Sequence, residues 1–228
     1  MTSAVTAGDR LRQLDPVFAQ MTLASAGHAR SVAELTDREK TFLAVVGDIC
    51  QGSLGLAFEA HVRAGLRAGV TVEDLRGLLR FVSYDIGYPA AVAGFEALAA
   101  LAEEPTTAAA LDESLVSTGP DAAPSPLPAP VRDRLAGMDP HFAEYFDLQS
   151  RMRGGNGPGT LSERERGLVS LSVDVHYGTL GDTFRIHVDR ALRGGASPDD
   201  VRAALRFNAQ FGVTRAWEAW LVLNPLLG

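Results

Sequence analysis

Two histidines occupy equivalent positions in the chain and are the residues best suited to acid–base chemistry. His61 and His187 each follow a phenylalanine by one helical turn, on the apolar stripe of an amphipathic pattern, so both should point to the interior or into a pocket. A partly desolvated imidazole held by a partner can move a proton at neutral pH. The alternative is a core histidine with both ring nitrogens satisfied, and the sequence leaves both interpretations open.

Four more polar residues recur close to these histidines. Asp48 and Asp174 are equivalent, and two residues after them come Cys50 and His176. All four fall near the end of the helix that precedes the histidine helix, so they could reach the same pocket mouth. An aspartate there could orient a histidine and raise its basicity. The structural alternatives are a turn-forming role for the aspartates and a small buried hydrophobe for Cys50.

Metal and cofactor sites are not expected. His176, His187, Asp174 and Asp182 offer enough donors for zinc or iron(II), but their spacing matches no ligand motif. The sequence has no nucleophile elbow and no phosphate-binding loop, since the glycine-rich run at 154–159 precedes no strand and lacks a lysine. We therefore predict no metal and no cofactor.

At two further positions the sequences of the two halves can be compared: one position is identical and the other differs. Arg80 and Arg206 recur in mid-helix, off the apolar stripe, where a solvated face or an inter-repeat salt bridge is the ordinary role and a carboxylate anchor is the alternative. Tyr84 could help to shape a pocket, but its counterpart is Gln210. The halves have diverged, so one of two pockets could be degenerate.

An internal repeat positions all of these residues. Residues 35–81 align without a gap with residues 161–207, at an offset of 126, and 18 of the 47 positions are identical. Upstream, residues 14–19 are echoed by residues 138–143 at an offset of 124. Residues 104–130 hold six of the twelve prolines, a composition typical of a linker. We predict a first domain at 1–103, a Pro/Ala-rich linker at 104–130 and a second domain at 131–228.

Within each repeat the apolar periodicity is helical. In the first repeat we expect a helix that starts after Thr36, an amphipathic helix over 54–68 that stops at Gly69, a helix from Thr71 to about Ile86, and a last helix over about 89–101. No stretch alternates apolar and polar residues over strand length. The predicted fold class is therefore all-α, with two tandem helical repeats.

Composition excludes several classes of protein. The 28 acidic and 21 basic residues give a net charge of −7, which argues against a general nucleic-acid binder. One cysteine excludes an intramolecular disulfide and a cysteine-rich zinc site. There is no run of roughly 18 apolar residues to span a membrane and no signal-peptide pattern at the N-terminus. We expect a soluble cytoplasmic protein with no nucleic-acid or membrane partner.

The motifs together resemble a known family. The pattern Leu-x-x-Arg-Glu at a helix start, then His-Val-Arg-x-x-Leu-x-x-Gly-Val-Thr-x-Glu-Asp-Leu, then Tyr-Asp-Ile-Gly-Tyr-Pro-Ala-Ala at 84–91, resembles the carboxymuconolactone decarboxylase family, which shares its fold with alkylhydroperoxidase D-like proteins. The resemblance covers residues 35–101 well and residues 161–223 more loosely. It implies an all-helical fold, assembly into a trimer or a hexamer-like ring, and a reactive pocket near the histidine helix, often at a subunit contact. A fused pair resembles a built-in dimer.

The chain also departs from the family pattern. Peroxidase members carry Cys-x-x-Cys before the helix histidine, where this chain has Leu54 and Ala57 in one repeat and Leu180 and Thr183 in the other. Without a thiol pair, their disulfide relay cannot run. Decarboxylase members usually place charged residues just before that histidine, and in the first repeat these positions are apolar. The resemblance thus carries the fold and the two histidines.

The leading functional hypothesis is a cofactor-independent lyase or isomerase that acts on a small acidic, lactone or polyketide-like substrate by decarboxylation, isomerisation or ring opening. His61 or His187 would be the general acid or base, and the remaining candidate residues would shape the pocket. One alternative is a non-catalytic helical oligomer that binds a ligand or partner. Another is a redox protein that uses Cys50 alone, which the missing second thiol disfavours.

Overall fold

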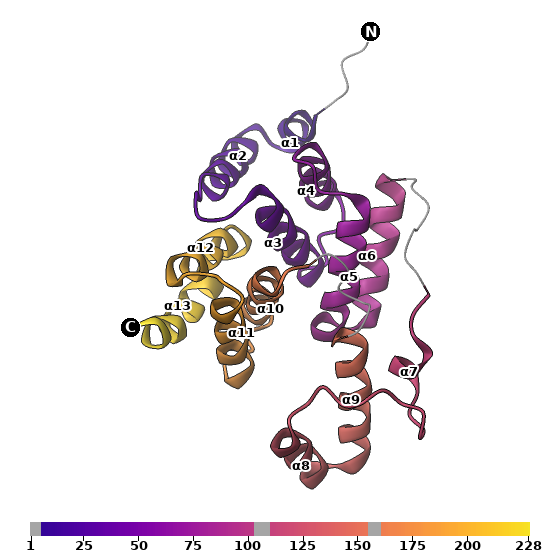
Figure 1. The fold of residues 1–228 in the computed structure, drawn as a ribbon. Helices are drawn as coiled ribbons and strands as arrows, with labels where there is room; N and C mark the ends of the chain where they lie inside the picture. The colour runs from indigo at the N-terminus through magenta and orange to yellow at the C-terminus, as the bar shows by residue number, and fades with distance from the viewer. Residues whose placement is uncertain (1–5, 103–109, 155–160) are drawn as a thin grey trace.

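The computed structural model describes residues 6–102, 110–154 and 161–228, and every regular element in these ranges is a helix (Figure 1). The all-α prediction is confirmed. None of the described helices is both long enough and apolar enough to span a membrane.

The helices of the two repeats follow one another in the same order. A short α7 lies between the repeats, and a 3-10 turn, η1, precedes the last helix. The first repeat comprises α1 (Ala7–Leu14), α2 (Pro16–Arg30), α3 (Asp37–Cys50), α4 (Leu56–Arg67), α5 (Val72–Ile86) and α6 (Tyr88–Leu101). After α7 (Glu113–Val116), the second comprises α8 (Ala129–Met138), α9 (Pro140–Gly154), α10 (Glu163–Tyr177), α11 (Asp182–Arg193), α12 (Pro198–Asn208), η1 (Ala209–Phe211) and α13 (Val213–Leu227).

Capping explains where the central helices begin. Thr36, Thr71, Ser162 and Ser197 each accept a hydrogen bond from the backbone N–H three residues on, and the acidic side chain at that position bonds back to the cap. Such a reciprocal pair satisfies two backbone donors that the first helical turn leaves open. The histidine helix α4 begins at Leu56, two residues later than predicted, because the chain is still turning after α3 and Gly55 is the N-cap.

The helices α3 and α10 form the centre of the molecule (Figure 1). They pack against each other and are buried on nearly all sides, with Phe42 and Leu43 on α3 and Leu168 and Leu171 on α10 at most 1% exposed. Helices that are buried on nearly every face form the core of a helical fold. One continuous cluster of buried side chains runs through both repeats, so the two halves share a single hydrophobic core.

Each histidine helix crosses its neighbour at very short range. A Cβ on Gly65 of α4 would lie 2.3 Å from the side chain of Thr41 on α3, and a Cβ on Gly167 of α10 would lie 2.4 Å from the backbone of Ala191 on α11. Thr41 aligns with Gly167, and Gly65 with Ala191. Each helix pair therefore keeps one glycine at its crossing, on opposite partners, and this fixes the histidine helix against the helix that carries the aspartate.

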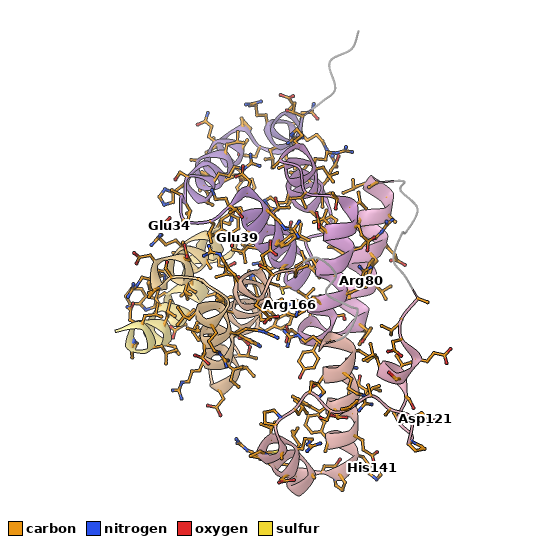
Figure 2. All side chains as sticks on the ribbon, viewed as in Figure 1. Glu34, Glu39, Arg80, Asp121, His141 and Arg166 are labelled. Atoms are coloured by element: carbon orange, nitrogen blue, oxygen red, sulfur yellow. The ribbon has the colours of Figure 1, made fainter. Side chains whose placement is uncertain are left out.

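Charged pairs join the two repeats along the central helices. Arg38 contacts Asp74 of its own repeat at 2.8 Å and Glu165 of the other at 2.7 Å. Arg164 contacts Asp200 and Glu39, both at 2.6 Å. Figure 2 labels Glu39 where the first repeat meets the second.

The region between the repeats contributes helices as well as irregular chain. Residues 103–109, at the start of the predicted linker, lie outside the described residues. The remainder of the linker includes α7, and α8 begins at Ala129, just inside its predicted end. Helix α9 then runs to the end of α5 (Figure 1) and packs against it. The exact boundaries of two domains stay a prediction.

Candidate active site

Both candidate histidines are hydrogen-bonded to the aspartate of their own repeat. Nδ1 of His61 lies 2.6 Å from Oδ2 of Asp48, and Nδ1 of His187 lies 2.6 Å from Oδ2 of Asp174. The aspartate sits in the last turn of α3 or α10, the chain reverses at a glycine with positive φ, and the histidine follows on the next helix. The same local hairpin therefore builds the same pair twice.

Hydrogen bonding determines which ring nitrogen is available. A carboxylate can only accept, so Nδ1 carries the proton of the neutral ring and Nε2 presents a lone pair. Among the described residues, none hydrogen-bonds Nε2 of His61 or of His187. In the second repeat, Oγ1 of Thr179 also donates a hydrogen bond to Oδ1 of Asp174, at a distance of 2.6 Å. Thr179 thus orients Asp174, and Asp174 orients His187 through Nδ1, while Nε2 of His187 has no hydrogen-bond partner among the described residues.

A cavity of about 190 Å³ lies beside His187. This is roughly six times the volume that one water molecule occupies in the liquid, so the cavity suits a small molecule. Its wall comes from both repeats: Tyr84 and Asp85 belong to α5 of the first, and the other residues belong to the second. The full lining is Tyr84, Asp85, Val173, Asp174, Tyr177, Thr179, Thr183 and His187.

A buried ion pair holds the first repeat's side of this cavity. Nη2 of Arg153, on α9, lies 2.6 Å from Oδ2 of Asp85 and 2.6 Å from Oγ of Ser170. The guanidinium also lies 4.5 Å from the ring centroids of Phe81 and Tyr84, close enough for cation–π attraction. Arg153 therefore fixes both α5 residues that face the cavity.

The local environment shifts the pKa values of the cavity acids. Desolvation raises the pKa of Asp85, while the charges of Arg153 and His187 oppose that rise. Desolvation also raises the pKa of Tyr84. In the first repeat, burial raises the pKa of Asp48, and its hydrogen bond with His61 opposes the rise. Burial therefore disfavours the charged forms of these three groups.

Cys50 and His176 follow the aspartates closely in sequence, and each lies next to an aromatic residue at the site of the opposite repeat. Burial raises the pKa of Cys50 to about 12, and its strongest polar partner is Tyr177, a residue of the His187 cavity. The His176 ring packs edge-on against Phe211 at 5.3 Å, and Phe211 packs at 6.1 Å against His61. Each of the two therefore borders the site of the opposite repeat.

The chemistry available to these two residues is limited. Neither ring nitrogen of His176 has a hydrogen-bond partner among the described residues. Burial, followed by the nearby charge of Arg215, lowers the pKa of His176 to about 4. At neutral pH this ring is uncharged, and the Cys50 thiol stays protonated. No three His, Cys, Asp or Glu side chains in the described part of the chain cluster closely enough to hold a metal ion.

The two repeated arginines make structural contacts. Arg80 pairs with Glu73 of its own helix at 2.6 Å. Arg206 pairs with Glu34 of the first repeat, which Figure 2 labels close to α12. Arg206 thus forms the inter-repeat salt bridge that was one of the two ordinary roles predicted for this position.

Several residues of the cavity were not singled out from the sequence. Asp85 interrupts the apolar stripe of α5, and an acid on a buried stripe is a signal that could have been used. Tyr177, Thr179 and Thr183 surround the histidine hairpin and carried no such signal. Arg153 lies at the end of a separate helix, so only the packing of α9 on α5 reveals it.

Comparisons with known proteins fit this architecture. The model of the carboxymuconolactone decarboxylase family matches residues 16–100 and 143–225, one region in each repeat. A crystal structure of a protein described as a gamma-carboxymuconolactone decarboxylase subunit, from Burkholderia xenovorans LB400, is similar with a TM-score of 0.53 and 23% identity, over 98% of this chain and 92% of that one. At that identity the likeness shows the fold alone. A search of curated proteins found no match.

Proposed function

Since this chain belongs to the carboxymuconolactone decarboxylase family, whose model matches both repeats, we propose that it is a lyase or isomerase that works by proton transfer at His187 without a cofactor. The observation that carries the proposal is the cavity of about 190 Å³ beside a histidine whose Nδ1 is held by Asp174. This hydrogen bond leaves Nε2 of His187 as the atom that exchanges a proton with the substrate.

In this mechanism Asp174 is a positioning residue and His187 acts on the substrate. As a base, Nε2 removes a proton from a carbon next to a carbonyl group, and the electron pair moves into an enolate. As an acid, it delivers a proton to the carbon that has lost carbon dioxide. The hydroxyl of Tyr84 donates to the developing enolate oxygen, which such a site must stabilise. Asp174 stabilises the imidazolium that forms in the first case.

The lining restricts the substrate class. Among the described residues of the lining, His187 alone can carry a positive charge, and the nearby Arg153 is already paired with Asp85. A substrate therefore carries at most one carboxylate. We propose a small lactone, a β-keto acid or a polyketide-like enol, each of which presents a carbonyl group to a hydroxyl donor and an acidic C–H bond or a carboxylate to Nε2.

Exchange of carbon-bound protons with solvent tests the proposal directly. Small lactones, β-keto acids and cyclic ketones are incubated with the protein in D₂O and followed by proton NMR, with carbon dioxide release measured in parallel. Enzyme-dependent exchange or decarboxylation is expected for at least one compound class. The His61→Asn variant is the matched control, because it changes the equivalent residue of the other repeat.

A ligand that binds without exchange or turnover would favour the alternative of a binding protein. Exchange that survives His187→Asn but not His61→Asn would reassign the reaction to the first repeat. Either result would contradict the proposal as stated.

We further propose that the chain assembles with copies of itself. Val213, Trp217 and Leu221 recur at helical spacing on α13 and are 70%, 62% and 53% exposed, an apolar stripe that a second copy could cover. The solved relative is described as a subunit. Light scattering after size-exclusion chromatography tests this assembly, and Trp217→Glu should shift the protein towards the monomer if the stripe is the contact.

A further inference from the structure

The repeat assigns a counterpart to every residue that lines the His187 cavity. At the offset of 126, Val173 corresponds to Gly47, Tyr177 to Gln51, and His187 to His61. Asp85, which lies on α5, corresponds to Phe211, which lies in η1. If the halves were equivalent, the first repeat would carry its own cavity next to His61, walled by these residues.

The ring of Phe211 occupies that place instead. Its centroid lies 6.1 Å from the centroid of the His61 ring in an edge-on arrangement. A Cβ built on Gly47 would lie 2.8 Å from two atoms of the same ring. The backbone carbonyl of Phe211 accepts a hydrogen bond from the Gln51 side chain at 2.7 Å. Three counterparts of cavity-lining residues therefore contact Phe211.

Two sequence differences between the repeats, at positions 47/173 and 85/211, explain why one site is open and the other is filled. Where Asp85 turns to Arg153 and leaves space beside Val173, Phe211 extends its ring over Gly47. Glycine is required at position 47, since even a methyl group there would overlap the ring. Compared with Val173 and Asp85, Gly47 has a smaller side chain and Phe211 a larger one. The two differences compensate each other, as expected of two residues that fill the same volume.

We infer that the first repeat holds a latent binding site for a planar six-membered ring, and that Phe211 is its built-in occupant. The site is the space bordered by Gly47, His61 and His176, and the ligand class is a phenol or a similar small ring whose polar group can reach Nε2 of His61. Beside His61, Phe211 thus occupies the place that corresponds to the open cavity beside His187.

Removal of the ring tests the inference with phenol as the probe. In Phe211→Ala, the partly buried space left behind has the shape of a phenyl group, and enclosed engineered cavities of this size bind small aromatic molecules. Calorimetry should give one more equivalent of bound phenol per chain than in the unchanged protein. In histidine ring NMR spectra, the His61 signals, assigned with His61→Asn, should shift on addition of phenol.

The double variant Phe211→Ala, Gly47→Val is the matched control. Its added side chain refills the space, so the extra equivalent should disappear while the fold is kept. The inference is overturned if Phe211→Ala folds, binds no additional phenol and shows no shift of the His61 signals.

Two further measurements keep the test decisive if Phe211→Ala does not fold. Phe211→Val removes the ring with a smaller loss of packing and should also gain phenol binding. In the unchanged protein, nuclear Overhauser effects should connect the ring protons of Phe211 and His61, and their absence would show that the ring does not occupy the site. None of these readouts depends on turnover at His187, so a failure here is distinct from a failure of the proposed function.

Discussion

Arg38 and Arg164 occupy equivalent positions in the two repeats, and each one contacts the capping glutamate of the other repeat. Arg38 lies 2.7 Å from Glu165, and Arg164 lies 2.6 Å from Glu39. The hydrogen bonds with Glu39 and then Asp200 raise the pKa of Arg164. Because each glutamate also caps its own central helix, the start of α3 and the start of α10 are tied together.

Arg164→Met is therefore expected to destabilise the whole chain. It leaves Glu39, which is 5% exposed, without its cationic partner, and such a loss costs about 2–3 kcal/mol of unfolding free energy for a partly exposed arginine. Urea denaturation measures the change. Arg185→Met is the control, since Arg185 and Asp182 are both largely exposed and removal of such a pair changes stability by less than about 1 kcal/mol. Equal effects of the two substitutions would contradict this prediction.

The two histidines should respond differently to the same substitution. His187→Asn is expected to reduce solvent exchange or turnover by about 10²–10⁴-fold, the usual contribution of a positioned acid or base. His61→Asn should leave the rate within about a factor of three, because the ring of Phe211 lies against that histidine. Initial rates in D₂O, on a compound that the unchanged protein processes, provide the measurement. Similar losses in both variants would mean that both sites work.

The buried pair of Asp85 and Arg153 makes a prediction about stability. Their side chains are 11% and 12% exposed. Arg153→Met leaves an unpaired buried carboxylate and should cost about 3–5 kcal/mol. The double variant Arg153→Met, Asp85→Asn should recover a large part of this loss, since the amide carries no charge to desolvate. A double-mutant cycle from urea melts measures the coupling, and additive effects would show that the two groups do not interact.

His176 should make the protein sensitive to mild acid. Burial lowers its folded-state pKa to about 4, below the usual 6.5 or so of an unfolded histidine. The unfolded chain therefore binds this proton more tightly, so the stability from the neutral ring is complete above about pH 6.5 and is lost as the pH falls towards 4. The loss amounts to about 3 kcal/mol.

The variant His176→Phe isolates this contribution. It keeps an aromatic ring against Phe211 and cannot titrate, so the stability difference between variant and unchanged protein should grow in favour of the variant between pH 6.5 and 4. His141→Phe serves as the control, because His141 lies exposed on α9 (Figure 2). Parallel pH profiles for His176→Phe and the unchanged protein would contradict the assigned environment.

The single thiol should react slowly in the folded protein. A rise of the pKa of Cys50 from 9.0 to about 12 lowers the thiolate fraction about a thousandfold at neutral pH. Iodoacetamide labelling followed by mass spectrometry is expected to be slow in buffer and fast in concentrated urea, where the thiol has its ordinary pKa. Rapid labelling of the folded protein would revive the hypothesis of a redox protein that uses Cys50.

The parts of the fold with local causes could be predicted from the sequence. Helix starts at Thr36 and Thr71 follow from capping residues, and the stop before Gly69 follows from a glycine that adopts a φ of +91°. The hydrogen bond between Asp48 and His61 joins residues 13 apart within one hairpin, so the expected orientation of the ring by the aspartate follows from short-range geometry. The catalytic role of the pair stays a prediction.

The composition of the cavity could not be predicted in the same way. Tyr84 and Asp85 meet His187 only because α5 of the first repeat packs against α10 of the second, and no periodicity in the chain encodes that contact. The sequence did show that Tyr84 lacks an equivalent tyrosine. It did not show that the next position, Phe211, would fill the space beside His61, because this depends on how far a ring reaches in three dimensions.

The covalent joining of the repeats has a consequence for how the two halves can change. In a ring of identical single-repeat chains, one altered codon modifies every site simultaneously, so a phenylalanine in place of aspartate would close all of them. Here residues 85 and 211 are encoded separately, so a change at residue 85 alters the wall of the His187 cavity and leaves Phe211 in place beside His61. The open site and the filled site can accordingly be redesigned one at a time, in each case through a residue that the opposite repeat contributes.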